Sequence, residues 1–348
     1  MNALSPIAAG GNESPPISAQ VDALAEAGDP RRSFLRAQWF SADTRLSDTV
    51  LLQDTRGEAI AAFPLIERKF GPLAVREVGG CYWPFRSIPI APHISVDTLA
   101  GAMAAQRNRL GRVWRLGPVE ANDPTLTTLL PAARKAGWQV LTRELGTVFE
   151  LDLAPAAAGE WPSTKTERKN RWRKRRLEED HGAIRVEFFS GLDWTGAQRD
   201  AMAAIEQASW LGKLDGGGDT KFSDTDMRAY WQALCSDPQL AAKLFGSIMW
   251  LGDMPAAFTF GIEAGDTRYY IANNFDDRFT KFGPGRVLLY EDFAHAAANG
   301  TTRASWGVGD AGYKTEMGAE PGSPLLDLLF VRGRVTANLL SLRWRDAR

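Results

Sequence analysis

The chain has 348 residues, of which 44% are hydrophobic and 24% charged, a globular composition that excludes disordered, collagen-like and coiled-coil chains. Its 41 basic and 42 acidic residues give a formal net charge of −1, so the chain as a whole is not a polycation built to bind nucleic acid. The length predicts about two domains. Two cysteines without a CxxC pair predict no disulfide framework and a reducing, cytoplasmic location.

The N-terminal segment, residues 1–20, is rich in Gly, Pro, Ser and Ala, and this composition predicts a disordered tail. It has neither a basic start nor a continuous apolar stretch, so we do not expect a secretory signal. No run of about 18 apolar residues occurs in the chain, and we therefore expect no transmembrane helix. Peripheral contact with a membrane surface stays open.

Residues 21–155 are expected to form a first domain that mixes strands with helices. The apolar runs 49–53, 59–66 and 147–153 read as strands. Residues 99–109 and 126–136 read as helices, and Gly137 stands where a glycine commonly ends a helix.

Residues 156–182 are expected to form a basic linker helix. Its segment 165–176 holds eight basic residues and one acidic residue, and His181-Gly182 is a stop signal. The charges surround the helical wheel, so most of the helix must face water or anions. A solvated linker, a phosphate-rich ligand, an anionic membrane surface and nucleic acid are the readings that remain.

Residues 183–348 are expected to form the second domain. Strands are predicted at 184–189, 247–251, 256–262 and 268–273, and helices at 199–208, 226–234 and 287–298. Strands interleaved with helices predict an α/β class. Segment 252–260 repeats segment 57–65 at four of nine positions, and both read as hairpins with a Gly-acidic turn. This echo favours a duplicated domain.

Several common sites are absent from the sequence, which contains no Walker A motif, no GxGxxG after a strand and no GxSxG. The three histidines, His93, His181 and His295, are too scattered for a local metal motif, so we expect no metal. The informative stretch is Phe282-Gly-Pro-Gly285, between a predicted strand and a predicted helix. Glycines at a helix start let backbone N–H groups approach a phosphate.

Three blocks of the second half resemble the GNAT-type acyltransferases of the CelD-like and FemAB-like group. They are the basic run 165–179, the segment 206–213 and the segment 261–318, which contains Tyr269-Tyr270 and Gly309-Asp-Ala-Gly-Tyr-Lys314. Residues 33–155, with the segment 80–85, resemble the degenerate first half of such proteins. The resemblance implies tandem GNAT-like domains, with mixed sheets flanked by helices.

The resemblance places an acyl donor, usually an acyl-CoA such as acetyl-CoA, on the second domain. The residues expected to bind it are Lys281, Gly283, Gly285 and Arg286. The loop departs from the family pattern Gln/Arg-x-x-Gly-x-Gly/Ala, because Arg278 lies too far ahead of Gly283. Aminoacyl-tRNA, which FemAB-like relatives can use, is therefore the alternative donor.

The implied reaction is attack of an amine on the acyl carbonyl, with both reactants held in one cleft. A backbone N–H near 269–272 is expected to stabilise the developing oxyanion. The candidates for the base that takes the amine proton are Asp310, Glu206 and Asp276. The residues expected to contact the acceptor are Trp210, Lys213, Tyr269, Tyr313 and Lys314, with Lys314 the best candidate for an acceptor phosphate.

Three functions follow from these patterns. The first is N-acylation of an amino sugar in an envelope or exopolysaccharide precursor, a pathway in which relatives of this group often serve. The second is transfer of an aminoacyl group from tRNA to a peptidoglycan precursor, which the basic segment favours. The third is a GNAT-like module that senses a nucleotide, suggested by the Arg- and Trp-rich C-terminal segments 332–334 and 342–345.

Overall fold

The computed structural model describes residues 15–70, 73–214, 218–310 and 312–344. Its strands are β1 (Leu46–Gln53), β2 (Ala59–Phe70), β3 (Leu73–Val78), β4 (Val113–Glu120), β5 (Trp138–Asp152), β6 (Ile184–Ser190), β7 (Leu244–Leu251), β8 (Met254–Ala264), β9 (Thr267–Phe275), β10 (Arg303–Val308) and β11 (Glu320–Arg332). Among the described residues they form one sheet in the order β1-β2-β3-β4-β11-β5-β10-β9-β8-β7-β6.

The helices flank this sheet. In chain order they are α1 (Ile17–Ala27), η1 (Pro30–Arg32), α2 (Ala37–Ser41), α3 (Val96–Ala105), α4 (Arg107–Leu110), α5 (Pro124–Lys135), α6 (Ala154–Ala157), α7 (Thr164–His181), α8 (Gly196–Ala208), η2 (Trp210–Lys213), α9 (Thr225–Leu234), α10 (Pro238–Ala241), η3 (Asp277–Phe282), α11 (Pro284–Ala298), α12 (Tyr313–Glu316) and α13 (Arg334–Ser341). The α/β class with a mixed sheet flanked by helices is thereby confirmed.

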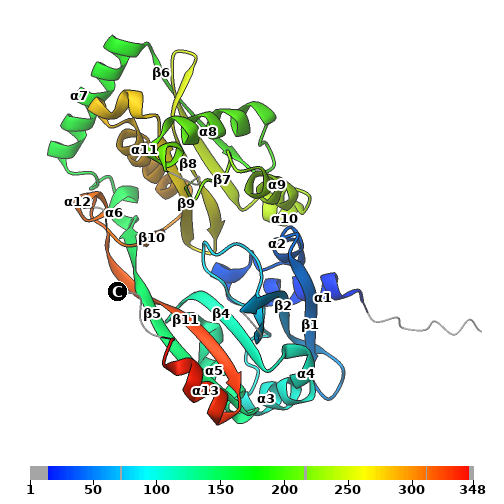
Figure 1. The fold of residues 1–348 in the computed structure, drawn as a ribbon. Helices are drawn as coiled ribbons and strands as arrows, with labels where there is room; N and C mark the ends of the chain where they lie inside the picture. The colour runs from blue at the N-terminus through cyan, green and yellow to red at the C-terminus, as the bar shows by residue number, and fades with distance from the viewer. Residues whose placement is uncertain (1–14, 71–72, 215–217, 311, 345–348) are drawn as a thin grey trace, which may run out of the picture.

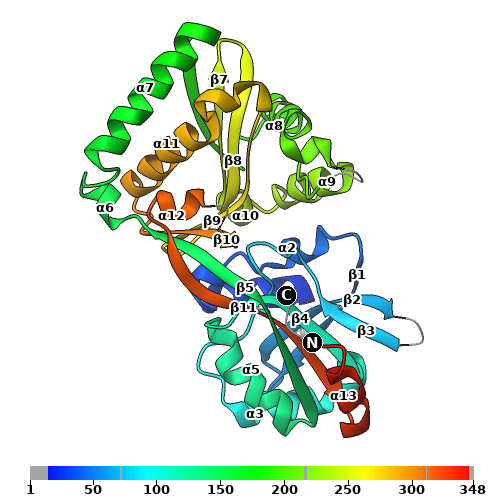
Figure 2. The ribbon, with the colours of Figure 1, turned by 60° about the vertical axis from the view of Figure 1, so that its left-hand side comes forward.

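The two halves of the chain exchange strands (Figures 1 and 2). β5, the last strand before α7, pairs with β10 of the second half. β11, the last strand of the chain, pairs with β4 of the first half and also with β5. A division at residues 156–182 therefore leaves β11 hydrogen-bonded within the sheet of the first half. The boundaries 21–155 and 183–348 remain a proposal.

Both halves use the same local order of elements. In the first half β1, β2 and β3 are antiparallel, and a connection containing α3 leads to β4, parallel to β3. In the second half β7, β8 and β9 are antiparallel, and α11 leads to β10, parallel to β9. The two similar sequence segments lie at equivalent hairpins, with Gly57 and Gly252 at positive φ in their turns. This shared order supports the interpretation that the halves are related.

Each strand and helix expected from the sequence occurs, with shifted ends. The helix predicted at 99–109 is divided, because α3 ends at Ala105 and α4 begins at Arg107. β3, β4, β10 and β11 were not predicted. β4 contains Gly117-Pro118 and β11 contains Pro321 and Pro324, and such residues weaken the strand pattern in a sequence.

The predicted tail ends before residue 20, because α1 begins at Ile17; residues 1–14 lie outside the described residues. Val21 and Leu24 of α1 are buried in the core, and this packing outweighs the polar composition of the segment. The predicted basic linker helix corresponds to α7. Ser163 caps its start, and Gly182 follows its end at positive φ.

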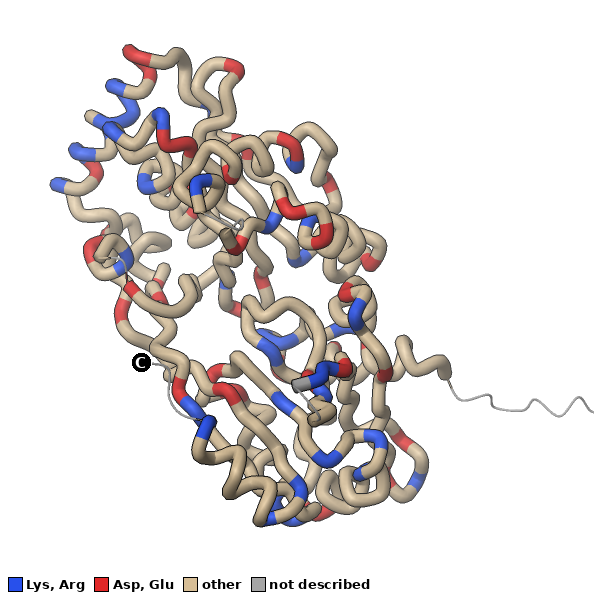
Figure 3. Tube along the Cα trace, viewed as in Figure 1, with Lys and Arg blue, Asp and Glu red and all other residues tan. Residues whose placement is uncertain are grey.

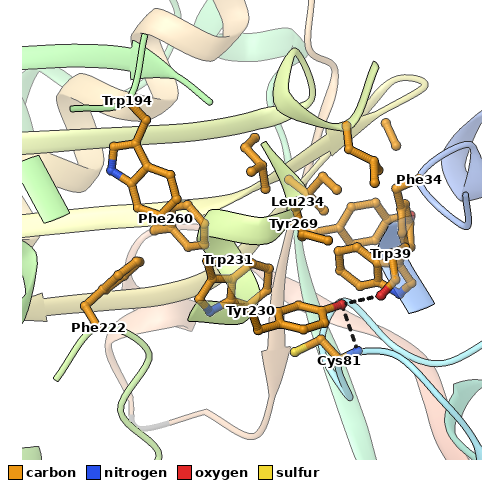
Figure 4. Close-up of a cluster of buried hydrophobic side chains, with 14 of the residues drawn as sticks. Phe34, Trp39, Cys81, Trp194, Phe222, Tyr230, Trp231, Leu234, Phe260 and Tyr269 are labelled. Carbon is orange, nitrogen blue, oxygen red and sulfur yellow. Dashed lines mark hydrogen bonds between the residues drawn. The ribbon is translucent and has the colours of Figure 1, made fainter. Parts of the chain in front are cut away.

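A core shared by both halves holds them together (Figure 4). Trp39 of α2 lies edge-on to Tyr230 and Trp231 of α9, with ring centroids 5.9 and 6.1 Å apart. The Tyr230 hydroxyl donates to the Trp39 carbonyl and accepts from the Cys81 N–H. Because this apolar cluster is continuous across the halves, neither half can separate without exposing it to water.

A buried ionic network lies beside this core. Arg32 of η1 forms ion pairs with Glu120, at the end of β4, and with Asp123, 2.9 Å away. It also donates to the Tyr269 hydroxyl of β9 at 3.1 Å. Arg32 is only 7% exposed, so its charge depends on these partners. The network joins the first half directly to β9 of the second.

Candidate active site

β9 and β10 are parallel neighbours that remain paired over only three positions. The partners are Arg303 with Thr267, Ala304 with Arg268, and Ser305 with Tyr269. Beyond these pairs β10 continues to Val308 and β9 continues to Phe275, with no further register between them in the described chain. The pairing of the two strands therefore ends at Ser305 and Tyr269, and we call the place beyond these residues, where the strands part, the opening.

A β-bulge lies on β9 at this opening. Phe260 of β8 faces Ala272 and Gly261 faces Tyr270, so Ile271 has no partner residue on β8. A bulged residue is left out of the regular hydrogen-bond ladder. The Ile271 N–H is therefore the candidate backbone donor within the segment 269–272, and its role toward a negative oxygen stays a prediction.

Trp83 of the first half contributes to the wall of the opening. Its indole Nε1 donates to the Tyr270 carbonyl at 2.6 Å. A side chain at Gly307 of β10 would lie about 3.1 Å from the Trp83 ring, so the ring packs closely against the β10 backbone. A side chain from the first half therefore lies against both β9 and β10.

Lys314 closes the far end of β10. Its Nζ donates to the carbonyls of Gly307 and Gly309 at 3.2 and 2.6 Å, and to that of Val308 at 3.4 Å. The residue is only 6% exposed, and burial lowers the pKa of its ammonium group to about 8. Lys314 therefore holds the backbone wall of the opening and places a cation there.

Asp310 lies in the exposed turn before Lys314. It accepts from the N–H groups of Gly312 and Lys314, and from the Thr315 hydroxyl. The Thr315 hydrogen bond, followed by the backbone donors, lowers the pKa of Asp310. These bonds hold Asp310 in the turn, and its exposure leaves it open to solvent.

Tyr313 bridges the opening from α12. Its hydroxyl is hydrogen-bonded to Asn273 of β9, and burial raises its pKa. The ring lies edge-on to Trp306 of β10, with centroids 5.6 Å apart. The predicted acceptor-contact residue therefore touches both separated strands.

The predicted donor loop forms the start of α11. Gly283 adopts the left-handed conformation, with φ of 59°, and a Cβ there would meet no atom within 4 Å. Gly285 is needed for another reason, because a Cβ would lie 2.9 Å from the Phe275 ring. The N–H groups of Arg286 and Val287 already bond to the Gly283 carbonyl. This loop therefore offers fewer free backbone donors than the sequence suggested.

Cationic side chains lie near the start of α11. Arg286 forms an ion pair with Glu316 at 2.8 Å. Burial, together with the like charge of Arg286, lowers the pKa of Arg173 on α7. The basic helix thus directs one arginine toward the start of α11, where the helix dipole also favours an anion. Lys281 is exposed nearby in sequence, with its ammonium over the Phe282 ring.

The other two carboxylates predicted as bases have structural partners. Glu206 is fully buried and accepts from the N–H groups of Lys221, Phe222 and Ser223 and from the Ser223 hydroxyl. Asp276 caps η3 and accepts from the backbone and guanidinium groups of Arg278. The structure does not bring these carboxylates together with Asp310.

Replacing Glu206 with alanine is expected to lower the free energy of unfolding by about 3 kcal/mol or more, because several buried donors lose their acceptor at once. Urea unfolding followed by circular dichroism would measure the change. Glu58→Ala, at an exposed position of the turn between β1 and β2, is the control. A stability unchanged in Glu206→Ala, together with lost transfer activity, would contradict the structural role and favour Glu206 as the base.

Three predicted acceptor contacts lie away from the opening. Tyr269 faces the first half in the Arg32 network, where burial raises its pKa to about 12. Trp210 is 57% exposed on η2. Lys213 forms an ion pair with Asp277 at 2.6 Å, which joins η2 to η3 just before α11. These assignments stay predictions.

The opening therefore brings together the bulge, Tyr313, Lys314 and the start of α11. Sequence reasoning missed Trp83, Asn273 and Arg173 as contributors. Each lies in a segment that resembles the family, Trp83 in 80–85, Asn273 in 261–318 and Arg173 in the basic run 165–179, but none was named as a site residue. At the C-terminus, Trp344 stacks on Arg143, 4.1 Å from its guanidinium, while Arg345 lies outside the described residues. The predicted nucleotide site there remains a prediction.

Within the described ranges, no group of three or more His, Cys, Asp or Glu side chains is arranged to hold a metal ion. In the same part of the chain, no helix combines the length and hydropathy required to cross a bilayer.

Comparison with known proteins agrees with this geometry. Residues 165–315 match the family model described as an acetyltransferase (GNAT) domain. The structure is similar to FemX, with a TM-score of 0.63 and 12% identity over 94% of this chain and 99% of that one. No curated protein sequence matches the chain significantly.

Two further solved structures share the fold across both halves. L-PGS from Bacillus licheniformis has a TM-score of 0.55 at 12% identity, covering 93% of this chain and 94% of that one. A conserved protein of unknown function from Bacteroides thetaiotaomicron has a TM-score of 0.56 at 14% identity, covering 90% and 97%. The chain carries a GNAT acyltransferase fold. Residues 165–315 match a GNAT acetyltransferase domain, and the fold of the whole chain is similar to that of FemX.

Proposed function

We propose that the protein is an N-acyltransferase that moves an acyl group from acyl-CoA to an amine, in particular the amine of an amino sugar in an envelope or exopolysaccharide precursor. The observation that carries the proposal is the opening between β9 and β10. It combines the bulge at Ile271 with the start of α11, so a carbonyl oxygen and an anionic donor can be bound close together.

In the proposed reaction the amine nitrogen attacks the acyl carbonyl carbon. The C–N bond forms, the Ile271 N–H stabilises the oxyanion, and the C–S bond then breaks to release CoA as a thiol. The amine proton must leave the nitrogen. We assign it to Asp310, which alone among the three predicted carboxylates is exposed and follows β10 at the opening.

The donor's phosphates are proposed to bind at the start of α11, between Arg173 and Arg286. Like-charged guanidinium groups close together are stabilised when an anion lies between them. Lys281, Gly283 and Gly285 complete this proposed site. Acetyl-CoA is the simplest donor to test.

The Arg173→Gln, Arg286→Gln double variant is expected to weaken acetyl-CoA binding at least about tenfold, because loss of charge-assisted hydrogen bonds costs about 1.5–3 kcal/mol. Isothermal titration of the purified protein with acetyl-CoA and CoA would measure the change. The matched control is Arg168→Gln, Lys169→Gln on the exposed face of α7. Absence of acetyl-CoA binding by the unaltered protein would overturn the proposed donor.

A second candidate is transfer from aminoacyl-tRNA to a peptidoglycan precursor, favoured by the exposed side of α7 (Figure 3). Six of its basic side chains are exposed: Lys165, Arg168, Lys169, Arg171, Arg175 and Arg176. If aminoacyl-tRNA is the donor, the exposed arginines and lysines of α7 are expected to matter for binding. The Arg168→Gln, Lys169→Gln variant should weaken binding of charged tRNA, and affinity should fall steeply with salt.

A further inference from the structure

The first half of the sheet has two differently covered faces. Residues on one face pack against α3 and α5, while alternate residues on the other pack against α13. On β4, Trp114 belongs to the first face and Val113 to the second; on β11, Phe330 and Val331 divide in the same way. The α13 face is apolar beneath that helix and becomes charged farther along the strands.

Charged residues from four neighbouring strands meet on the α13 face. Glu77 of β3 faces Arg115 of β4 in the register, and Asp327 of β11 faces Arg143 of β5. Arg68 lies on the neighbouring β2 strand and reaches Glu77 at 3.2 Å. These contacts create a continuous charged strip across the sheet.

Arginines outnumber carboxylates in this strip. Glu77 forms ion pairs with Arg68, Arg86 and Arg115, and Asp327 forms ion pairs with Arg115 and Arg143, both at 2.7 Å. We call Arg68, Arg86, Arg115 and Arg143 the arginine cluster. Its four positive charges share two described carboxylates.

The carboxylates lie beneath the arginines. The side chains of Glu77 and Asp327 are 2% and 0% exposed, whereas those of Arg68, Arg143 and Arg115 are 40%, 29% and 23% exposed. Water and solutes therefore meet guanidinium groups rather than the neutralising oxygens. A surface built in this way attracts anions.

One nitrogen of Arg86, its Nε, lacks a hydrogen-bond acceptor, although the guanidinium also pairs with Glu77. The residue is 7% exposed. Burial, together with the neighbouring charges of Arg115 and Arg68, lowers its pKa. A buried guanidinium donor without an acceptor is costly, and an anion oxygen would satisfy it.

The arginine cluster is also held in a defined arrangement. The Trp344 ring stacks on the Arg143 guanidinium, and its Nε1 donates to the Asp327 carbonyl at 3.2 Å. Arg86 donates to the Gly117 carbonyl at 2.9 Å. Planar guanidinium groups fixed in this way suit the tetrahedral oxygens of phosphate.

The cluster is connected to the opening by packed side chains. Arg86 follows Trp83 and Phe85 in the same loop, and Leu325 precedes Asp327 by two positions on β11. Trp83, Phe85 and Leu325 form one apolar cluster against which Ile271 packs. The arginine cluster and the bulge are therefore joined by one buried apolar cluster.

We propose that the arginine cluster binds a phosphate or diphosphate group of the acyl acceptor and so directs its amine toward the opening; the acceptor part of this inference rests on the proposed transferase function. The ligand chemistry is an oxyanion with several hydrogen-bond acceptors, two of which one arginine can bind at once. A nucleoside diphosphate and an isoprenyl diphosphate are the two sources of that group.

The test is isothermal titration with inorganic pyrophosphate in the absence of any acyl donor. The Arg68→Gln, Arg143→Gln double variant is expected to bind pyrophosphate at least about tenfold more weakly than the unaltered protein. This variant leaves Glu77 paired with Arg86 and Arg115, and Asp327 paired with Arg115. Neither buried carboxylate loses all its partners, so the fold should persist, and thermal unfolding would verify this.

The matched control removes two positive charges elsewhere in the same half. Arg56→Gln, Arg134→Gln changes an exposed hairpin turn and the exposed side of α5, on the opposite face of the sheet. This control should bind pyrophosphate as the unaltered protein does. Equal weakening in both double variants would show only a general charge effect and would overturn the proposal.

Two further titrations identify whether the diphosphate belongs to a nucleotide or to a lipid carrier. Uridine diphosphate and farnesyl diphosphate are titrated in parallel, and the one that binds more tightly than pyrophosphate identifies a nucleotide or lipid carrier. Failure of pyrophosphate to bind at millimolar concentration would overturn the site whatever the transferase assay shows. Binding lost in the double variant, in a protein without transferase activity, would leave the anion site in place and contradict the proposed function alone.

Discussion

Replacing Arg32 with methionine is expected to lower the free energy of unfolding by about 3–5 kcal/mol, the usual cost of removing one partner from a buried ion pair. The change leaves Glu120 and Asp123 without their shared cation, and the Tyr269 hydroxyl without its donor. Because this network joins the halves, the loss should also weaken their contact. Chemical unfolding followed by both tryptophan fluorescence and circular dichroism would measure it.

A second substitution tests whether the buried charge causes the loss. Glu120→Gln in the Arg32→Met background should recover part of the lost stability, since it removes an uncompensated carboxylate. Burial already raises the pKa of Glu120 despite Arg32, so removal of Arg32 should raise it further. The variant would then regain stability as the pH falls. Stability of Arg32→Met within about 1 kcal/mol of the unaltered protein would contradict this account.

Replacing Lys314 with methionine is expected to lower the rate of acyl transfer at least about 100-fold, since small displacements of a catalytic site can cost that much. The lysine ammonium binds three consecutive carbonyls of the β10 wall, and methionine provides no donor for them. Steady-state kinetics with the donor and acceptor varied separately would measure the loss. Unchanged kinetics would contradict a role for Lys314 at the opening.

The same variant is expected to change how the free energy of unfolding depends on pH. Burial lowers the pKa of folded Lys314 from 10.5 to about 8, so the unfolded chain binds more protons between these values. The free energy of unfolding should therefore rise from about pH 8 toward pH 10 in the unaltered protein. This rise should be smaller in Lys314→Met, while Lys135→Met, at an exposed position of α5, should retain it. An identical pH dependence in both variants would contradict the buried position of the charge.

The local pattern of the sequence was sufficient to predict most of the individual strands and helices in the second half. Short apolar runs marked the strands at 49–53 and 256–262, and the helical period marked 199–208 and 226–234. The two hairpin turns and the end of α7 were predictable because each depends on a few consecutive residues with a glycine at positive φ. The resemblance of three blocks likewise pointed to the GNAT fold.

The site was predictable only in part. Lys314 and Tyr313 were named from one short motif, and the structure places them at the opening. Glu206 resembles a free helix-surface carboxylate in the sequence, but its acceptors are saturated by the segment 221–223, which lies beyond α8 in the chain. Tyr269 and Tyr270 are adjacent, yet the alternation of the strand turns Tyr269 toward the first half and Tyr270 toward Asp292 of α11.

The sequence by itself determined the helical and extended periods, the turn glycines and the concentration of positive charge on α7, since each of these depends on residues close together in the chain. Only the tertiary structure decided that β5 and β11 cross between the halves, that Ile271 is bulged and that Trp83 lines the opening. Trp83 and Tyr270 are 187 positions apart, and no local preference encodes that contact. Such pairs form because burial of apolar surface favours one arrangement of the whole sheet.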